Sequence, residues 1–357
     1  MAAIKRILFV GDLNFYAKGA SRLKAMEDLG IRVIGLPHTA QGDPATGAPG
    51  LSFYERLAWK LGVHIDSGQV NRKIPAIAAL EKPDLLWIEK GNMISRATLK
   101  AVRDRSPGTK IIGYSDDDMF NPLNHTRAYV RTLPHYDLVF TTKSYNAHAD
   151  ELPALGAKRV VMVDKAYDPD QHKLLPLTAA ERAELAADVS FIGSYAPERG
   201  EVLNFLAANG ISVVVWGNGW GRFTAASPRL TIKNQALVNS PENLRFTKAI
   251  NASRINLGFL RKVNRDLQTD RSIEIPASGG FLLAERSPEH ERLFEDGREA
   301  VYFDSNAELL DKIRHYLAHE DTRAAIATAG HARSRASGYS HRDRMAEMLA
   351  VCWGLQK

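Results

Sequence analysis

The chain has 357 residues, more than a single hydrophobic core usually supports, so its length predicts two domains with a cleft between them. Apolar residues make up 45% of the chain and charged residues 25%, and no apolar run is long enough to span a bilayer, which indicates a soluble globular protein. The net charge of +6 is spread along the sequence, with 41 acidic residues among 47 basic ones, and this pattern argues against nucleic acid as a partner. Small anions, or an anionic membrane surface, would be attracted by the same mild positive field.

The N-terminal residues Met1–Arg6 lead into a short apolar segment that lacks the long apolar region and the cleavage site of a secretion signal. The single cysteine, Cys352, can form no internal disulfide, as is typical of proteins in a reducing cytoplasm. We therefore expect a cytoplasmic protein, with peripheral contact to the inner face of the membrane as an alternative. The single cysteine leaves no cysteine cluster that could hold zinc, and we expect neither a metal nor a cofactor.

Short runs rich in β-branched residues alternate with segments of helical periodicity along the chain, a pattern typical of parallel α/β architecture. The expected strands fall into two series, which predicts two sheets. The first series is Ile4–Val10, Arg32–Leu36, Leu85–Glu89, Lys110–Tyr114, Leu138–Thr141 and Val160–Val163. The second series is Val189–Gly193, Ser212–Trp216, Ile255–Phe259, Gly280–Ala284 and Ala300–Phe303. Between them, Asp164–Thr178 contains proline and aspartate without periodicity and is the expected interdomain linker.

Three helices can be predicted near the C-terminus. Ser305–Leu317 has apolar residues at helical spacing, with Ser305 or the residue before it as the N-terminal cap. Asp321–Ala336 forms the second helix. The amphipathic segment His341–Trp353 forms the third, which we expect to cross back and brace the first domain. The Gly- and Pro-rich stretch Ala40–Gly50 is expected to be a surface loop.

In open parallel sheets, ligands bind beyond the carboxyl ends of the strands, where free N–H groups at helix N-termini favour anions. Each half of the chain has such an entrance: one strand ends at Gly11 and Asp12, and another ends at Gly193, Ser194 and Tyr195. Neither entrance has the spacing of a dinucleotide fingerprint or of a phosphate-cradling P-loop. The glycine of the first entrance could equally serve only the tight packing of a helix on its strand.

The segment 264–280 carries a sharper cluster of polar residues. Asp266 is followed eight positions later by Glu274, and then by the small-residue turn Ser278-Gly279-Gly280, which enters an apolar strand. A carboxylate on the first turn of a helix can accept hydrogen bonds from both hydroxyls of a ribose. The segment is therefore a candidate nucleotide site. The alternative is that Glu274 is a solvated helix residue and the glycines form a plain turn.

The stretches RSIEIPASGGFLLAER at residues 271–286 and ERLFEDGREAVYFD at residues 291–304 resemble the C-terminal signature of the spore-maturation CgeB-like glycosyltransferases, a branch of the GT-B superfamily. Shorter similar stretches are residues 137–143, 165–172 and 216–220, so the resemblance covers most of the chain. In the first domain, however, it is confined to short separate segments.

This resemblance implies the α/β fold called GT-B, with two Rossmann-like parallel-sheet domains that face a cleft. Residues 1–166 would bind the acceptor, residues 167–340 would bind the nucleotide sugar, and residues 341–357 would form the returning helix. The implied activity is the transfer of a sugar from a nucleotide-diphosphate sugar to a glycan, lipid-linked, protein or small-molecule acceptor, as in polysaccharide biosynthesis.

The Glu-x7-Glu motif of retaining GT-B enzymes falls on Asp266 and Glu274, with aspartate in place of the first glutamate. By this resemblance Glu274 would hold the nucleotide ribose and Asp266 would meet the donor sugar, which makes both candidate catalytic residues. Arg271 would join them, because Arg271 and Arg199 would stabilise the negative charge of the departing diphosphate. Either arginine could instead be a surface salt-bridge partner. The other candidate donor-binding residues lie in three glycine-containing loops: Gly193, Ser194, Tyr195, Gly217, Asn218, Trp220, Ser278, Gly279 and Gly280.

On the acceptor side, Asp116 and Asp117 lie just beyond the end of the expected strand Lys110–Tyr114. Adjacent carboxylates suggest a divalent metal. GT-B enzymes, however, neutralise the diphosphate with cations and helix N-termini, so we expect these aspartates to cap a helix or to bind acceptor hydroxyls. The remaining acceptor-side candidates are Gly11, Asp12, Lys90 and His125, of which His125 is the best placed to act as a base.

The expected reaction retains the anomeric configuration and needs no dedicated base, because the departing phosphate can take the proton of the acceptor. An inverting enzyme would need one. Two alternatives stay open. An epimerase or phosphorylase with the GT-B fold would act without a separate acceptor. A non-catalytic protein could keep the fold and only bind a nucleotide sugar.

Overall fold

The computed structural model describes residues 4–39, 52–60, 62–240 and 242–355. The stretch Ala40–Gly50, which the sequence predicts to be a loop, lies outside the described residues. The chain divides into two compact units. Unit 1 comprises Met1–Asp164 together with His341–Lys357, and unit 2 comprises Lys165–Ser340.

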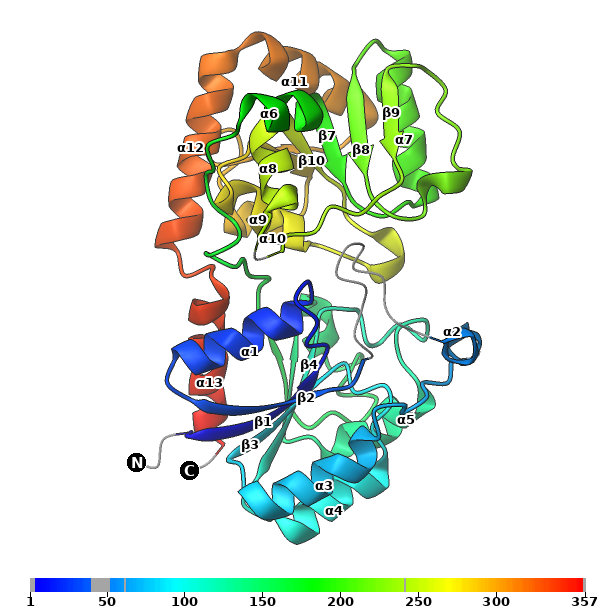
Figure 1. The fold of residues 1–357 in the computed structure, drawn as a ribbon, viewed down its shortest axis with the longest axis vertical. Coiled ribbons are helices and arrows are strands. Elements are labelled where there is room, and N and C mark those ends of the chain that lie inside the picture. The colour runs from blue at the N-terminus through cyan, green and yellow to red at the C-terminus, as the bar shows by residue number, and fades with distance from the viewer. Residues whose placement is uncertain (1–3, 40–51, 61, 241, 356–357) are drawn as a thin grey trace. The chain divides into compact units, whose positions relative to one another are not determined.

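Unit 1 contains a six-stranded parallel sheet with the strand order β2-β1-β3-β4-β5-β6 (Figure 1). Its strands are β1 (Arg6–Gly11), β2 (Arg32–Pro37), β3 (Leu85–Glu89), β4 (Lys110–Ser115), β5 (Leu138–Thr141) and β6 (Val160–Met162). Its helices are α1 (Lys18–Asp28), α2 (Phe53–Lys60), α3 (Val70–Glu81), α4 (Arg96–Arg105), α5 (Arg127–Thr132) and α13 (His341–Trp353), with 3-10 turns at Leu133–His135 and Ser144–Ala147.

Helices cover both faces of this sheet, as β1 illustrates. Ile7 and Phe9 belong to a core cluster that contains residues of α1 and α13, whereas Leu8 and Val10 belong to a cluster that contains residues of α3 and α4. A strand buried on both faces needs apolar residues at every position, which is why the sequence reads as a continuous apolar run.

Unit 2 contains a second six-stranded parallel sheet with the order β12-β11-β10-β7-β8-β9. Its strands are β7 (Ala187–Ile192), β8 (Val213–Trp216), β9 (Leu230–Lys233), β10 (Ser253–Gly258), β11 (Leu282–Glu285) and β12 (Val301–Phe303). Its helices are α6 (Ala179–Leu185), α7 (Pro197–Ala208), α8 (Arg245–Ala252), α9 (Asp270–Ala277), α10 (Pro288–Leu293), α11 (Asn306–Ala318) and α12 (Glu320–Ala336), with 3-10 turns at Trp220–Arg222 and Lys262–Asn264.

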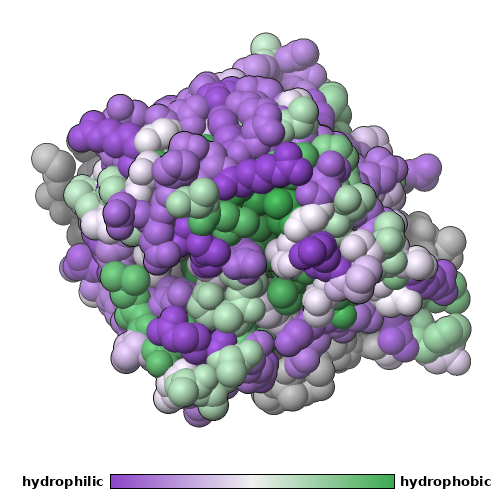
Figure 2. Space-filling model, turned by 90° about the horizontal axis from the view of Figure 1, so that it is seen from above, coloured by the Kyte–Doolittle hydropathy of each residue, from purple (hydrophilic) through white to green (hydrophobic). Residues whose placement is uncertain are grey.

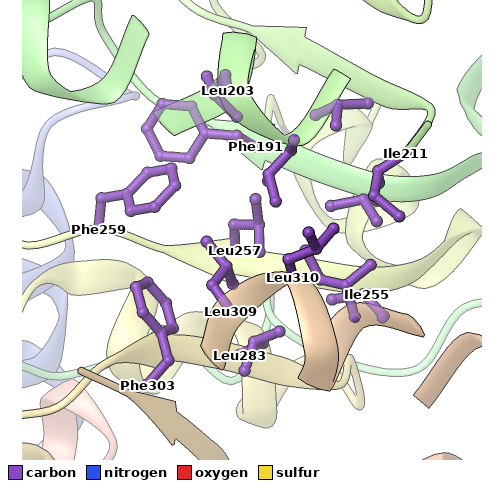
Figure 3. Packing of buried hydrophobic residues seen from close by; sticks show 14 of the residues in the cluster. Phe191, Leu203, Ile211, Ile255, Leu257, Phe259, Leu283, Phe303, Leu309 and Leu310 are labelled. Carbon is purple, nitrogen blue, oxygen red and sulfur yellow. The ribbon is translucent and has the colours of Figure 1, made fainter. Parts of the chain in front are cut away.

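The two sides of β7 show how this sheet is covered. Phe191 packs in the cluster of Figure 3, where side chains from the strands and from α7 and α11, such as Leu203 and Leu309, point toward one another. Ile192 belongs to the cluster on the other side, which contains Ile273 of α9. Viewed from above, the surface is largely hydrophilic, with hydrophobic residues gathered in a hollow near its middle (Figure 2).

The predicted two parallel sheets are confirmed, and most predicted elements lie within a residue or two of those observed. Helix α13 has the predicted bounds, and Ser305 caps α11 by accepting a hydrogen bond from the Glu308 N–H. The strand predicted at Gly280–Ala284 begins later, at Leu282. Strand β9 was not predicted. Asp164–Thr178 contains no helix or strand, and the boundary between the units falls at its first residue.

Candidate functional site

The loops that follow β7 and β8 pack closely at the carboxyl edge of the unit 2 sheet. The Gly193 N–H donates to the Trp216 carbonyl over 2.8 Å, and the Trp220 indole N–H donates back to the Gly193 carbonyl over 2.9 Å. The Tyr195 N–H donates to the Asn218 carbonyl over 2.9 Å. A Cβ atom on Gly217 would lie 1.9 Å from the Gly193 carbonyl oxygen, so glycine is required at 217. The predicted donor-binding residues of both loops therefore lie together.

Arg271 and Glu274 lie on α9, one turn apart. The Arg271 Nε donates to the Ile192 carbonyl at the end of β7 over 3.2 Å, which places its guanidinium beside the Gly193 loop. Glu274 is 2% exposed. Its Oε1 lies 3.5 Å from His172 Nε2, and its Oε2 lies 3.8 Å from Arg271 Nη1. Glu274 is thus a buried carboxylate with cationic or polar neighbours and not a solvated helix residue.

The start of α9 is fixed by a capping box and a buried histidine. The Thr269 N–H donates to the Ser272 hydroxyl oxygen over 2.9 Å, and the Ser272 hydroxyl lies 2.6 Å from His290 Nε2. His290 Nδ1 lies 2.7 Å from the Glu285 carbonyl, so Nδ1 carries the proton and Nε2 accepts from Ser272. Burial lowers the pKa of His290 to about 4. The histidine is therefore neutral at physiological pH and holds the helix in place.

Arg199, in the first turn of α7, adds a further cation at this edge. Its Nη1 donates to the Ser194 carbonyl over 2.9 Å, and its buried Nε has no hydrogen-bond partner among the described residues. Burial lowers the pKa of the Arg199 guanidinium, and the positive charges of Arg261 and Arg271 lower it further. The negative charge of Glu198 opposes this lowering. Arg261 and Arg271 are thus each close enough to repel Arg199, and an anion bound beside Arg199 would relieve that repulsion.

Asp266 lies in the loop between the 3-10 turn and α9, where it accepts a hydrogen bond from the Asn264 amide over 2.8 Å. The negative charge of Asp266 opposes the lowering of the Arg199 pKa, so the two side chains are near each other. Arg261 and His172 were not predicted as site residues. Arg261 lies shortly after the end of β10, and its position in a loop beyond a strand was a usable signal. Nothing in the sequence connects His172 with Glu274, 102 positions later.

The turn Ser278-Gly279-Gly280 does not join these residues. It connects the C-terminus of α9 to β11, and because the sheet is parallel it lies at the amino edge of the sheet, opposite the loops after β7 and β8. Gly279 has a φ of +80° and Gly280 packs against Ile250, so both glycines serve the turn. The donor-binding role predicted for these three residues is therefore not supported by their position.

At the carboxyl edge of the unit 1 sheet lies a pocket of about 580 Å³. Three of the predicted acceptor-side residues line it, namely Asp12, Lys90 and Asp116. Lys90 has a φ of +59°, uncommon for a residue with a side chain, and its Nζ lies 2.6 Å from the Asp117 carboxylate. The pocket lies beyond the carboxyl ends of the parallel strands, where open α/β sheets bind their ligands.

The other three acceptor-side candidates, Gly11, Asp117 and His125, are not among the residues that line this pocket. A Cβ on Gly11 would lie 2.8 Å from the Phe9 ring and 3.3 Å from Glu89, so its glycine is needed for packing. His125 Nδ1 lies 2.8 Å from the Met119 carbonyl and its ring stacks on Tyr129, 6.2 Å between centroids. Neither contact supports a role of His125 as a base.

A buried ion-pair network forms one wall of the pocket. Arg22 donates to both oxygens of Glu89, over 2.5 and 2.9 Å, and to Asp116 over 3.2 Å. Its guanidinium also lies 4.1 Å from the centre of the Tyr114 ring. Burial raises the pKa of Glu89, and the charge of the facing Arg22 guanidinium opposes that shift. This network was not predicted, because Arg22 and Glu89 are far apart in the chain.

Two histidines line the same pocket. The buried Nδ1 of His38 has no hydrogen-bond partner in the part of the chain that the structure describes, and burial lowers the pKa of His38. Burial also lowers the pKa of His64, to about 4, with a further contribution from the charge of Lys90. Both imidazoles are therefore neutral at pH 7 and able to bind hydroxyl groups.

Among the described residues, no group of three or more His, Cys, Asp or Glu side chains is arranged to hold a metal ion. None of the helices they form combines the length and the apolar character needed to cross a bilayer.

Residues 199–350 match the sequence family described as Glycosyl transferase-like. No curated protein sequence matches the chain.

Solved structures resemble the whole chain at low sequence identity. Sucrose-phosphate synthase from Thermosynechococcus elongatus is 11% identical with a TM-score of 0.64, over 98% of this chain and 99% of that one. Anabaena HepE in complex with UDP-glucose is 13% identical with a TM-score of 0.62, over 97% and 99%. An alpha-glucosyltransferase in complex with UDP and a 13-mer DNA is 12% identical with a TM-score of 0.67, over 98% and 99%. The shared fold and the match over residues 199–350 together support a glycosyltransferase of the GT-B type.

Proposed function

We propose that this protein transfers a sugar from a UDP-sugar, bound at the carboxyl edge of the unit 2 sheet, to a hydroxyl of an acceptor bound in the pocket of unit 1. The observation that carries the proposal is the buried carboxylate of Glu274 beside Arg271, at the same edge as Arg199. UDP is favoured as the nucleotide because similar structures carry UDP or UDP-glucose.

On the donor side, Glu274 would accept hydrogen bonds from the ribose hydroxyls, since a carboxylate only accepts. The guanidinium groups of Arg199, Arg261 and Arg271 would bind the diphosphate and stabilise the charge that grows on it as the glycosidic bond breaks. Asp266 would face the donor sugar. With this many cations at one edge the transfer would need no metal, which is the class of mechanism that the sequence predicts.

On the acceptor side, the pocket favours a neutral molecule with a hydroxyl group and an apolar portion. Arg22 is already paired with Glu89 and Asp116, and Lys90 with Asp117, so these cations are not available to an anionic acceptor. Apolar side chains make up much of the remaining lining: Val63, Ile65, Ile88, Met93 and Ile94. A pocket of this size suits a small molecule or the end of a glycolipid better than a nucleic-acid strand.

In the reaction, the bond from the sugar C1 to the diphosphate oxygen would break and C1 would bond to the acceptor oxygen. The hydroxyl proton would pass to an oxygen of the departing UDP, and the configuration at C1 would be retained. Membership of the CgeB-like branch and a role in polysaccharide biosynthesis complete the proposal, and they rest on the sequence resemblance. The proposed cytoplasmic location rests on the single cysteine.

The first test is a melting-temperature screen with UDP, GDP, ADP, CMP and dTDP. A nucleotide at a hundredfold excess over its dissociation constant adds about 2.7 kcal/mol to the free energy of unfolding, so UDP should raise the melting temperature by several degrees. UDP-glucose turnover with and without a phenolic glycosyl acceptor then separates a transferase from an epimerase. NMR of the product gives the anomeric configuration. A chain that none of the nucleotides stabilises would overturn the proposal.

A further inference from the structure

A second hollow lies in unit 2, away from the residues of the proposed donor site. It has a volume of about 310 Å³ and its lining includes Arg182, Arg254, Arg323 and the turn Gly279-Gly280. Because this turn leads into β11 and Arg254 is at the start of β10, the hollow lies at the amino edge of the sheet. Glu274 and Arg271 are not among its lining residues, so the hollow is distinct from the donor site.

The arginines of this hollow come from three separate elements. Arg182 lies on α6, Arg254 on β10 and Arg323 on α12. Arg323 is 7% exposed, and an arginine this deeply buried usually has a close carboxylate partner. Here the Glu320 carboxylate lies 3.7 Å from the Arg323 Nη2, and the Nη1 donates to the Tyr316 carbonyl over 2.6 Å.

The charge of Arg323 is therefore only partly compensated. Burial lowers the pKa of its guanidinium, and the positive charge of Arg254 lowers that pKa further. Arg254 donates to Asp188 over 3.1 Å and to the Leu317 carbonyl over 2.7 Å, which leaves further N–H groups of its five for a ligand. The exposed Arg182 shows no side-chain hydrogen bond or ion pair with any described residue.

The described residues that line the hollow include three arginines and no aspartate or glutamate. Guanidinium groups bind phosphate oxygens through paired N–H donors, which is why arginine clusters recognise phosphate. We propose that this hollow binds a phosphate group, either inorganic phosphate or the phosphate of a small monoester. It would be a second anion site of the protein, beyond the proposed donor site.

The hollow has room for more than the phosphate itself. Apolar side chains of Leu174, Leu177 and Ile250 also line it, so the organic part of a small phosphate ester would find contacts beside the arginines. The bound ligand would connect α6, β10 and α12 through their arginines and stabilise unit 2 as a whole.

The test is isothermal titration of the full chain with inorganic phosphate, glycerol 3-phosphate and mixed phosphatidylcholine–phosphatidic acid vesicles. Each titration is carried out with and without saturating UDP, because phosphate could also enter the donor site. We expect binding of phosphate and its glycerol ester that UDP does not abolish. Arg182→Ala should weaken it about tenfold or more, since a hydrogen bond to a charged group is lost.

Matched variants make the result decisive. Arg229→Ala removes an exposed arginine outside the hollow and should leave phosphate affinity unchanged. Arg271→Ala should leave it unchanged as well, whether or not the protein binds UDP. Phosphate binding that Arg271→Ala abolishes and Arg182→Ala does not would place the anion at the donor site and overturn the proposal. So would the absence of phosphate binding, or binding of the vesicles alone.

Discussion

Replacing Glu274 with glutamine tests the donor site most directly. Glutamine keeps the volume of the side chain but removes the negative charge of the carboxylate, whose oxygens would accept hydrogen bonds from the ribose hydroxyls. Because Glu274 is only 2% exposed, water screens its interactions little. A hydrogen bond to a charged group contributes about 1.5–3 kcal/mol, so Glu274→Gln should weaken UDP binding by roughly tenfold to a hundredfold.

The assay is titration calorimetry with UDP and with 2′-deoxy-UDP on both forms of the protein. In the wild type, loss of the 2′-hydroxyl should weaken binding. In Glu274→Gln the same loss should matter much less, because the partner of that hydroxyl has changed, and the double-mutant cycle isolates this coupling. Glu201→Gln, an exposed position on α7, is the control. If Glu274→Gln binds both nucleotides like the wild type, with an unchanged melting temperature, the assignment of Glu274 to the ribose is wrong.

Four further results are expected. Glu89→Ala should lower the free energy of unfolding by about 3–5 kcal/mol, because it leaves Arg22 buried beside fewer charges; an unchanged urea midpoint would contradict this. Gly217→Ala should reduce both the melting temperature and UDP affinity, since its Cβ would lie 1.9 Å from the Gly193 carbonyl oxygen. The pKa of His290 is lowered to about 4 in the folded protein, below its value of 6.5 in the unfolded chain. The free energy of unfolding should therefore stay constant above pH 6.5 and fall by about 3 kcal/mol as the pH is lowered to 4. His290→Asn should reduce this fall. EDTA should leave UDP-glucose turnover unchanged, and a loss restored by Mg²⁺ would contradict a metal-independent reaction.

Features encoded over a few neighbouring residues could be predicted from the sequence. The apolar run at Ile7–Val10 predicts a strand buried on both faces, and the Ser305 cap with helical periodicity predicts α11. The edge strand β9 could not be found in this way, because its sequence LTIK is short and has exposed polar positions.

The site was predictable only where its residues lie close in the sequence. Arg271 and Glu274 share one helix, so their proximity follows from helical spacing. The turn Ser278-Gly279-Gly280 was predicted to lie at the donor site. Helix α9 continues to Ala277, however, and the turn therefore lies at the opposite edge of the sheet. The contacts of Glu274 with His172 and of Glu89 with Arg22 depend on how distant segments pack, and no local pattern encodes them.

The return of α13 to unit 1 determines where the protein can be divided. The chain leaves unit 1 at Asp164 and re-enters it at His341, so unit 2 is one continuous segment and unit 1 is not. A fragment that stopped at residue 164 would lack Met345 and Cys352, and the neighbours of these residues in the core, Met26 among them, would meet water. Residues 165–340 are therefore the natural fragment for expressing the nucleotide half alone, whereas the other half requires both of its pieces, joined or mixed.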